Sequence, residues 1–160
     1  MEIVRHPLNP IFDSESHTLL LGTMPSPKSR EAGYYYAHPQ NRFWPVLAAV
    51  YGEAAPRDDA ARRALILGHH LALWDVLARC EIRGASDASI RGAVANDIVS
   101  LIEQSAVSRV FCTGQSAGRY YRRLVENKTG IACGVLPSTS PANCRVPFDE
   151  LVKCYSAALL

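Results

Sequence analysis

The chain has 160 residues, the length of one ordinary domain, and folding at this length buries about 70% of the surface that the unfolded chain exposes. Hydrophobic residues make up 48% and charged residues 20%, which excludes a disordered, collagen-like or coiled-coil protein. With 17 basic and 15 acidic residues the net charge is +2, so binding to nucleic acid would require a local basic face. We expect a single domain over residues 1–160.

Apolar runs and helical patterns alternate along the chain. Four short apolar runs without alternation are typical of strands buried on both faces of a parallel sheet. Between these runs, apolar residues recur at helical spacing. In chain order we expect a strand at 17–21, helices at 41–51 and 58–67, a strand at 70–73, a helix at 96–106, a strand at 109–113, a helix at 115–126, a strand at 131–136 and a helix at 147–159.

The order of these elements predicts the fold class. Strand–helix alternation with short connections indicates an α/β fold around a parallel sheet of four strands, and Asn96 is the expected N-cap of the helix at 96–106. Ligands of such sheets bind beyond the carboxyl ends of the strands. These ends carry Gly22–Ser26, Trp74–Asp75, Gly114–Ser116 and Pro137–Asn143.

The N-terminus, the apolar runs and the cysteines bear on localisation and on metal binding. Met1–Pro7 lacks the basic and apolar regions of a secretory signal peptide, and no apolar run approaches the roughly 20 residues of a membrane helix. We therefore expect a cytoplasmic protein. The 5 cysteines contain no CxxC pair, so we expect neither a disulfide framework nor a zinc or iron–sulfur site. His69–His70 is expected to be a solvated turn rather than a metal pair.

The segment from Gly22 to Trp44 combines a rigid Gly–Pro turn with five aromatic side chains. Asn41 and Arg42 lie among these rings. Aromatic rings with an amide and one cation suit a flat heteroaromatic ligand, which is stacked on its face and hydrogen-bonded at its edge.

The same residues also have purely structural interpretations. Phe43 and Trp44 fall on the apolar face of a helix, so for these two we favour a place in the core. Tyr34–Tyr36 lie in a loop, and both interpretations stay open for them. Asn41 precedes a helix and also fits a plain N-cap.

A second segment, Leu136–Asn143, has the sequence LPSTSPAN, in which two prolines bracket three hydroxyl residues. The result is a stiff loop rich in donors that suits contacts with phosphate, although an ordinary turn is the alternative. Three other well-known site motifs are excluded, because the sequence lacks their residues at the required spacing. The chain has neither the GK[ST] of a phosphate-binding P-loop, nor the glycine triplet of a dinucleotide fold, nor the GxSxG elbow of a serine hydrolase.

Together the two segments resemble the uracil-DNA glycosylase superfamily. GTMPS at 22–26 and YAHPQNRFW at 36–44 look like the first motif of its mismatch-specific branch. LPSTSPAN, and LWDVLARC at 73–80, look more like its hypoxanthine-DNA glycosylase branch. The resemblance runs from about His6 onward.

The resemblance implies a three-layer α/β/α sandwich around a four-stranded parallel sheet, with neither metal nor cofactor. The implied protein is a monomer with no contact to membranes, and its partner is DNA that contains deaminated bases. It flips the base out of the duplex and hydrolyses its N-glycosidic bond, hypoxanthine first and uracil second, leaving an abasic site for base-excision repair.

The resemblance also implies roles for individual residues. The catalytic residues would be Asn41 and Ser138. The base-binding residues would be Gly22, Thr23, Met24, Tyr36, Trp74 and Asp75. The DNA-binding residues would be Ser26, Ser29, Ser140, Pro141, Ala142, Asn143 and Arg145. Backbone N–H groups at Thr23, Met24 and Ser138 could stabilise the base as it leaves as an anion.

Met24 is the main departure from the family pattern, because the mismatch branch has an asparagine there. A thioether cannot hold or activate water, so the water-positioning role passes to another residue, with Asn41 the expected one. If it does not, the protein is a module that binds lesions without cleaving them. A third hypothesis is a hydrolase of free nucleosides, which would need no basic DNA-binding face.

Overall fold

The computed structural model describes all residues from Met1 to Leu160. The strands are β1 (Glu2–Arg5), β2 (Thr18–Gly22), β3 (Leu71–Asp75), β4 (Leu77–Arg83), β5 (Ser86–Ala95), β6 (Arg109–Thr113) and β7 (Cys133–Leu136). The helices are α1 (Pro27–Ala32), α2 (Phe43–Val50), α3 (Asp59–Gly68), α4 (Ile98–Glu103), α5 (Gln115–Leu124), α6 (Glu126–Thr129), the 3-10 turn η1 (Pro141–Asn143) and α7 (Phe148–Leu159). None of these helices has the length and apolar character needed to cross a bilayer.

The four predicted strands form one parallel sheet in the order β3-β2-β6-β7. In the centre, Leu20 of β2 lies beside Leu73 of β3 and Phe111 of β6. Leu19, Leu20 and Leu21 are each 0% exposed, as expected for a strand covered on both faces. The predicted α/β class and the parallel four-stranded sheet are confirmed.

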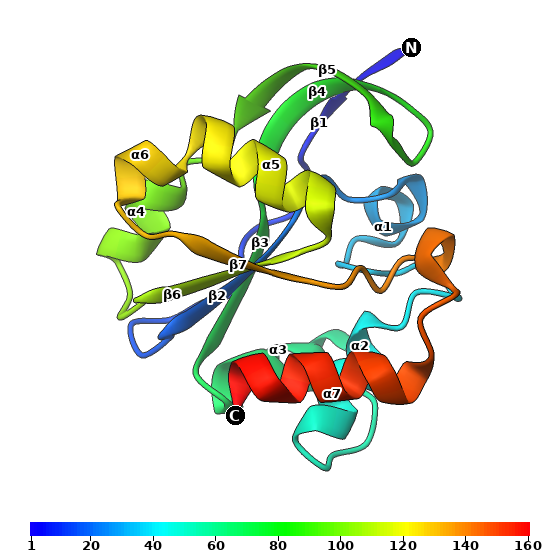
Figure 1. Ribbon diagram of the computed structural model, residues 1–160, viewed down its shortest axis with the longest axis vertical. Helices are drawn as coiled ribbons and strands as arrows, with labels where there is room; N and C mark the ends of the chain where they lie inside the picture. Colours follow the sequence, from blue (N-terminus) through cyan, green and yellow to red (C-terminus); the bar gives the residue numbers. More distant parts are fainter.

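Helices cover both faces of the sheet, which makes three layers (Figure 1). Helices α2, α3 and α7 pack on one face, where Leu20 joins Phe43 and Tyr155 in a common apolar cluster. Helices α4 and α5 cover the other face, where Leu19 and Leu21 join Tyr121. Successive side chains of β2 thus pack into the two different apolar clusters, since they point alternately to the two faces of the sheet.

A second, antiparallel sheet in the order β1-β4-β5 was not expected from the sequence. Strand β4 buries Cys80 and Ile82 and exposes Glu81 and Arg83, so its alternation is a usable signal over a short stretch. Strand β5 follows a tight turn at Gly84, and its register with β4 shifts three times, which blurs its alternation. The β4–β5 hairpin begins at the carboxyl end of the main sheet, because β4 starts at Leu77, directly after β3.

Several element boundaries differ from the expected ones. Helix α1 was missed, and α5 ends at Leu124 rather than at 126. The predicted N-cap Asn96 is wrong, because Asp97 caps α4 and accepts the amide of Ser100. The Asn96 side chain is already engaged: its Nδ2 donates to backbone carbonyls at positions 75 and 77, each at 3.0 Å.

One buried hydroxyl ties the last helix to the loop that follows β7. Tyr155 on α7 is 0% exposed, and its hydroxyl donates to the Pro137 carbonyl at 2.7 Å. In Tyr155→Phe that carbonyl would lose its partner beside a fully buried ring, so we expect a loss of about 0.5–1.5 kcal/mol in the free energy of unfolding, measured with urea. The control is Tyr120→Phe, whose hydroxyl has no hydrogen bond within the chain and whose loss should cost under about 0.5 kcal/mol. Equal stabilities of the two variants would contradict this account.

Candidate active site

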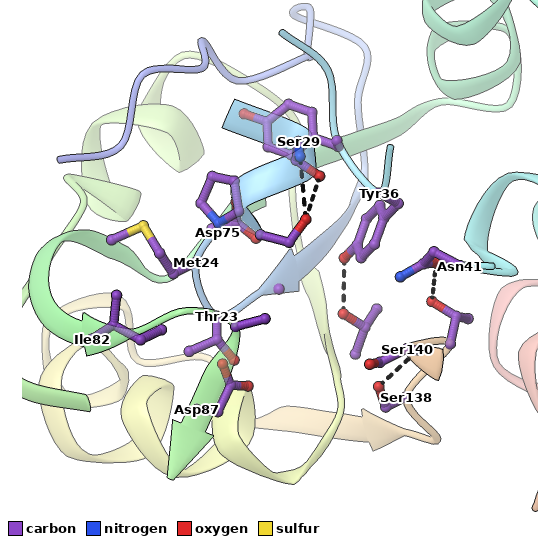
Figure 2. Close-up of a pocket in the computed structure, with 17 residues that line it drawn as sticks. Thr23, Met24, Ser29, Tyr36, Asn41, Asp75, Ile82, Asp87, Ser138 and Ser140 are labelled. Carbon is purple, nitrogen blue, oxygen red and sulfur yellow. Dashed lines mark hydrogen bonds between the residues drawn. The ribbon is translucent and has the colours of Figure 1, made fainter. Parts of the chain in front are cut away.

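The carboxyl ends of β2, β3, β6 and β7 meet at a pocket of about 130 Å³. This is the place that the parallel sheet predicts. Figure 2 shows its walls. They come from the turn after β2, the loop before α2, the loop after β7 and the β4–β5 hairpin.

Tyr36 forms an aromatic wall of the pocket. Its ring stacks on Phe43 with centroids 4.0 Å apart and planes 15° apart, and its hydroxyl lies 2.9 Å from Thr113 Oγ1. The backbone of Tyr36 is left-handed, with φ of 56°, which is rare for a side chain of this size. Burial, and then the charge of Asp75, raise the pKa of its hydroxyl well above the usual range, so Tyr36 is a neutral hydrogen-bonding ring.

The other aromatic residues of this segment do not line the pocket, except for an edge of Tyr35. Phe43 and Trp44 are buried, as favoured from the sequence. Tyr35 is also buried and donates to the Asn9 carbonyl at 2.7 Å. Tyr34 lies outside, under the Arg62 guanidinium at 3.7 Å. Of the three tyrosines left open, Tyr36 and Tyr35 therefore line the cavity, and Tyr34 does not.

Asn41 combines a structural and an exposed polar group. Its Oδ1 accepts the backbone N–H of Phe43 and the hydroxyl of Thr139, each at 2.9 Å. These two donors identify the oxygen and occupy both of its lone pairs. The N-cap position itself is Arg42, whose side chain caps nothing. Nδ2 of Asn41 makes no hydrogen bond within the chain, so it is a free donor in the wall of the pocket.

Arg42 does not offer its charge to a ligand. Its Nη1 donates to the Val146 carbonyl at 2.6 Å, and Nη2 donates to the Asn143 carbonyl at 3.1 Å. Its backbone N–H donates to the Thr139 carbonyl at 3.1 Å. The guanidinium thus fastens the loop after β7 to the start of α2.

The floor of the pocket is a close approach between Gly22 and a buried carboxylate. A Cβ on Gly22 would lie 2.3 Å from Asp75 Oδ1 and 3.0 Å from the Tyr36 hydroxyl, so only glycine fits. Asp75 Oδ2 lies 2.7 Å from His6 Nε2. His6 Nδ1 accepts the N–H of Leu8 at 3.2 Å, which leaves the proton on Nε2 and makes a neutral imidazole the donor to Asp75.

Backbone donors of two loops complete the pocket. The N–H groups of Thr23, Met24 and Ser138 make no hydrogen bond within the chain, and all three residues line the cavity. The Ser138 hydroxyl accepts the N–H of Ser140 at 3.1 Å, and it can still donate its own proton. The pocket is therefore rich in hydrogen-bond donors.

Asp87 is a pocket residue that the sequence analysis missed. It belongs to β5 and lies beside Thr23, on the part of the wall away from Tyr36 and Asn41 (Figure 2). Burial raises the pKa of its carboxyl; the neighbouring Thr23 hydroxyl lowers this pKa, and the charge of Asp75 raises it again. No motif surrounds Asp87, so the only signal that could have found it is the alternation of β4, which places a hairpin here.

Two residues expected at the site have other places. Trp74 is not in the pocket wall; its ring lies edge-on to His6, with centroids 6.5 Å apart. Ser29 touches the pocket but is 1% exposed, and its hydroxyl accepts the N–H of Ala37 at 3.0 Å. Ser29 therefore supports the loop that carries Tyr36, and it is too deeply buried to contact DNA directly.

The other expected DNA-binding residues lie at the surface beside the pocket. Ser26 caps α1 and is partly exposed. Asn143 donates from Nδ2 to the Ser138 carbonyl at 2.8 Å, so its side chain is tied to the loop. Ala142 and Arg145 are exposed. A groove of about 730 Å³ runs past Ala142 and Asn143 to the β4–β5 hairpin.

The residues set aside as metal ligands are separate from the pocket. His69 stacks on Tyr51 at 3.7 Å and bonds the carboxylate of Glu53, while His70 is exposed. All 5 cysteines are free. No three His, Cys, Asp or Glu side chains converge on a point where they could hold a metal ion.

The chain is similar to known proteins over nearly its whole length. A sequence model of the uracil DNA glycosylase superfamily matches residues 10–157. A Methanosarcina acetivorans protein named hypoxanthine DNA glycosylase is 32% identical over 137 residues, which cover 84% of this chain and 85% of that protein. A protein of the same name from Methanosarcina barkeri is 29% identical over 138 residues, which cover 85% and 86%.

A solved structure shares the fold. It is the solution NMR structure of a Methanosarcina acetivorans protein described as a candidate uracil DNA glycosylase. It matches this chain with a TM-score of 0.80 at 25% identity and covers 98% of both chains. The three-layer arrangement around a four-stranded parallel sheet is therefore shared with that protein.

Gly22 offers a test of the pocket floor. In Gly22→Ala the new methyl group would overlap Asp75 Oδ1, so the buried carboxylate or the end of β2 must move. Overpacking of this kind costs about 1–3 kcal/mol, which urea denaturation would show. The control is Gly68→Ala on α3, where nothing lies within 4 Å of the added carbon. A Gly22→Ala protein as stable as the control would show that the floor is not closely packed.

Proposed function

Because the chain belongs to the uracil DNA glycosylase superfamily, we propose that it is a monofunctional DNA glycosylase that removes hypoxanthine from DNA. It hydrolyses the N-glycosidic bond and leaves an abasic site for base-excision repair. Uracil is its second substrate. The names of both curated relatives support the choice of base.

One observation carries the proposal: the free Nδ2 donor of Asn41 and the ring of Tyr36 border the same small cavity. A flipped base needs both a face to stack on and partners along its edge. Phe43 covers the other face of the Tyr36 ring at 4.0 Å, so the base would become the third ring of a stack. The left-handed backbone at Tyr36 keeps the ring in that position.

The donors of the pocket favour a deaminated base. Adenine presents an amino donor at the position where hypoxanthine presents a carbonyl acceptor, and the same exchange relates cytosine to uracil. Against the free N–H groups of Thr23 and Met24 and the Asn41 amide, an amino group would leave donors unpaired, whereas a carbonyl oxygen satisfies them. A buried donor without a partner is costly, which gives the discrimination.

The same donors serve the chemistry. Cleavage of the glycosidic bond is largely dissociative, so the sugar becomes an oxocarbenium ion while the base leaves as an anion. Fixed N–H groups aimed at the base stabilise its growing negative charge. Asn41 takes part as a donor to the base. Its oxygen, occupied by Phe43 and Thr139, is not free to accept a proton from the attacking water.

The exposed loop beside the pocket is the proposed DNA-binding element. Pro141 and Ala142 form the tip of η1, and this small wedge would fill the gap that the flipped nucleotide leaves. Ser140 and Asn143 hold the loop, because each makes a hydrogen bond within it. Arg145 is exposed just beyond and would contact a phosphate.

The assay for this function is single-turnover incubation with a duplex that contains one inosine, followed by alkali, which cleaves abasic sites. We expect a strand break at the inosine and a weaker one at uracil, mostly where the opposing base pairs poorly, because such bases unstack easily. Met24 favours the alternative, a module that binds lesions without cleaving them. That module would bind the inosine duplex and yield no break. A nucleoside hydrolase would show no salt-dependent binding to DNA.

Tyr36→Ala tests the stacking platform. Stacking of a base on an aromatic ring contributes about 1–3 kcal/mol, so affinity for the inosine duplex should fall roughly ten- to a hundredfold. The matched variant Tyr36→Phe keeps the ring and loses only the contact with Thr113, and it should bind nearly as the parent does. Binding titrations measure both. Unchanged affinity of a folded Tyr36→Ala protein would rule out stacking on this ring.

Asn41→Asp separates the two uses of this side chain. The carboxylate can still accept from Phe43 and Thr139, so the fold should keep its stability, but the free donor becomes a negative oxygen. Loss of such a group slows a reaction by about 10²–10³-fold, and single-turnover rates on the inosine duplex should fall accordingly. Asn127→Asp on exposed α6 makes the same change of charge away from the pocket and should be active. A normal rate for Asn41→Asp would leave Asn41 only a structural role.

A further inference from the structure

The proposed reaction needs a group that accepts a proton from water, and most acceptors in the pocket are already engaged. Asn41 Oδ1 receives two hydrogen bonds. The Ser138 hydroxyl accepts the N–H of Ser140. Oδ2 of Asp75 is bonded to His6, and Oδ1 lies packed against Gly22 at the floor. Met24 has no polar atom in its side chain. The Asp87 carboxylate is the remaining ionisable group in the wall.

Asp87 lies where the sugar of a flipped nucleotide must be. The base would occupy the small pocket, while the DNA strand would follow the adjoining groove past Ala142. Only Ala85, Asp87, Ser138 and Ser140 line both cavities, so they mark the junction between them. C1′ connects the base to the strand and therefore lies at this junction. Asp87 is the one residue of the four that can be charged.

From this geometry, and resting on the proposed function, we propose that Asp87 is a catalytic residue that positions the attacking water and takes its proton. The β4–β5 hairpin thus supplies the acceptor that the turn after β2 lacks at Met24. Asp87 lies outside both motifs that carry the family resemblance.

The bond between C1′ and the base nitrogen breaks, and its electron pair leaves with the base. The water oxygen forms the new bond to C1′, and one water proton passes to the Asp87 carboxylate. Asp87 then releases this proton to solvent or to the departed base. Before the water attacks, the carboxylate also offers negative charge to the sugar cation.

The surroundings of Asp87 suit a proton acceptor. Burial and Asp75 at the end of β3 raise the pKa of its carboxyl, while Thr23 after β2 and Arg119 on α5 lower it, with a raised pKa as the result. Cys80 on β4 is also near Asp87: burial, and then the charge of Asp87, raise the pKa of that thiol, while Arg30 on α1 lowers it. A carboxylate with a raised pKa is a stronger base than an ordinary one, and general-base catalysis contributes about 10²–10⁴-fold.

The test compares Asp87→Asn with the parent enzyme on the inosine duplex. We expect single-turnover excision about 100-fold slower, since the amide cannot take a proton, with affinity for the duplex equal to that of the parent or higher, since a negative charge beside the phosphates is removed. Because only the ionised carboxylate is active, the parent rate should fall as pH drops through the pKa of Asp87. That acid limb should be missing in Asp87→Asn. Added formate should partly restore the rate of Asp87→Ala, because it supplies a carboxylate in the space left open.

Glu81→Gln is the matched control, because it removes one carboxylate from the exposed face of the neighbouring strand β4. It should cleave at the parent rate, with the same pH profile. If Asp87→Asn also keeps the parent rate, or if it loses affinity and rate in equal measure, the catalytic role is wrong and the glycosylase proposal stands. A parent enzyme that releases no base from any inosine or uracil duplex would overturn the proposed function itself, and this inference with it.

Discussion

The hydrogen bond from the Thr139 hydroxyl to Asn41 Oδ1 joins two loops that lie 98 residues apart in the chain. It fixes which end of the amide faces the pocket, because the oxygen is consumed and the nitrogen is left free. Arg42 strengthens the junction by binding carbonyls at 143 and 146, and Tyr155 holds the same loop from the side of α7. These hydrogen bonds join the loop that carries Asn41 to the loop after β7. A shift of either loop would therefore misplace both the Asn41 donor and the proposed DNA-binding tip.

The floor of the pocket depends on a different constraint, the contact between Gly22 and Asp75. The strand β2 ends where a neighbouring carboxylate leaves no room for a Cβ, and the Tyr36 hydroxyl lies against the same spot. His6 reaches this carboxylate from the segment after β1, so the small antiparallel sheet is linked to the main one below the pocket. The imidazole gives the buried carboxylate a hydrogen-bond partner, and a buried carboxylate without one costs several kcal/mol in an apolar interior. The floor is therefore rigid because it is both tightly packed and hydrogen-bonded.

The sequence predicted the main sheet well and the small sheet not at all, and the reason is physical. Strands such as β2 are buried on both faces, so most of their residues are apolar and the run is visible without knowledge of its partners. Strand β5 is largely exposed and bulged, and its pairing is set by β4. Tyr36 and Asn41 could be found because they stand in a dense motif. Asp87 could not, since its place in the pocket depends on how a hairpin packs. Trp74 lies near a strand end and yet is outside the pocket wall, and Ser29 touches the pocket but is buried, because spacing determines neither side-chain direction nor burial.

We propose that Asn41 and Asp87 divide between them two roles, donor and acceptor, that one amide could perform alone. An asparagine in the turn after β2 can both donate and accept, so a single side chain could serve base and water. With Met24 in that turn, the proposed donor lies in the loop before α2 and the proposed acceptor lies in the β4–β5 hairpin. A carboxylate beside DNA would also be affected by the charge of the phosphates. Phosphates of the bound strand disfavour its charge and raise its pKa further, while Arg119 acts in the opposite sense. A bound strand would thus make Asp87 a stronger base at the moment when water must be activated.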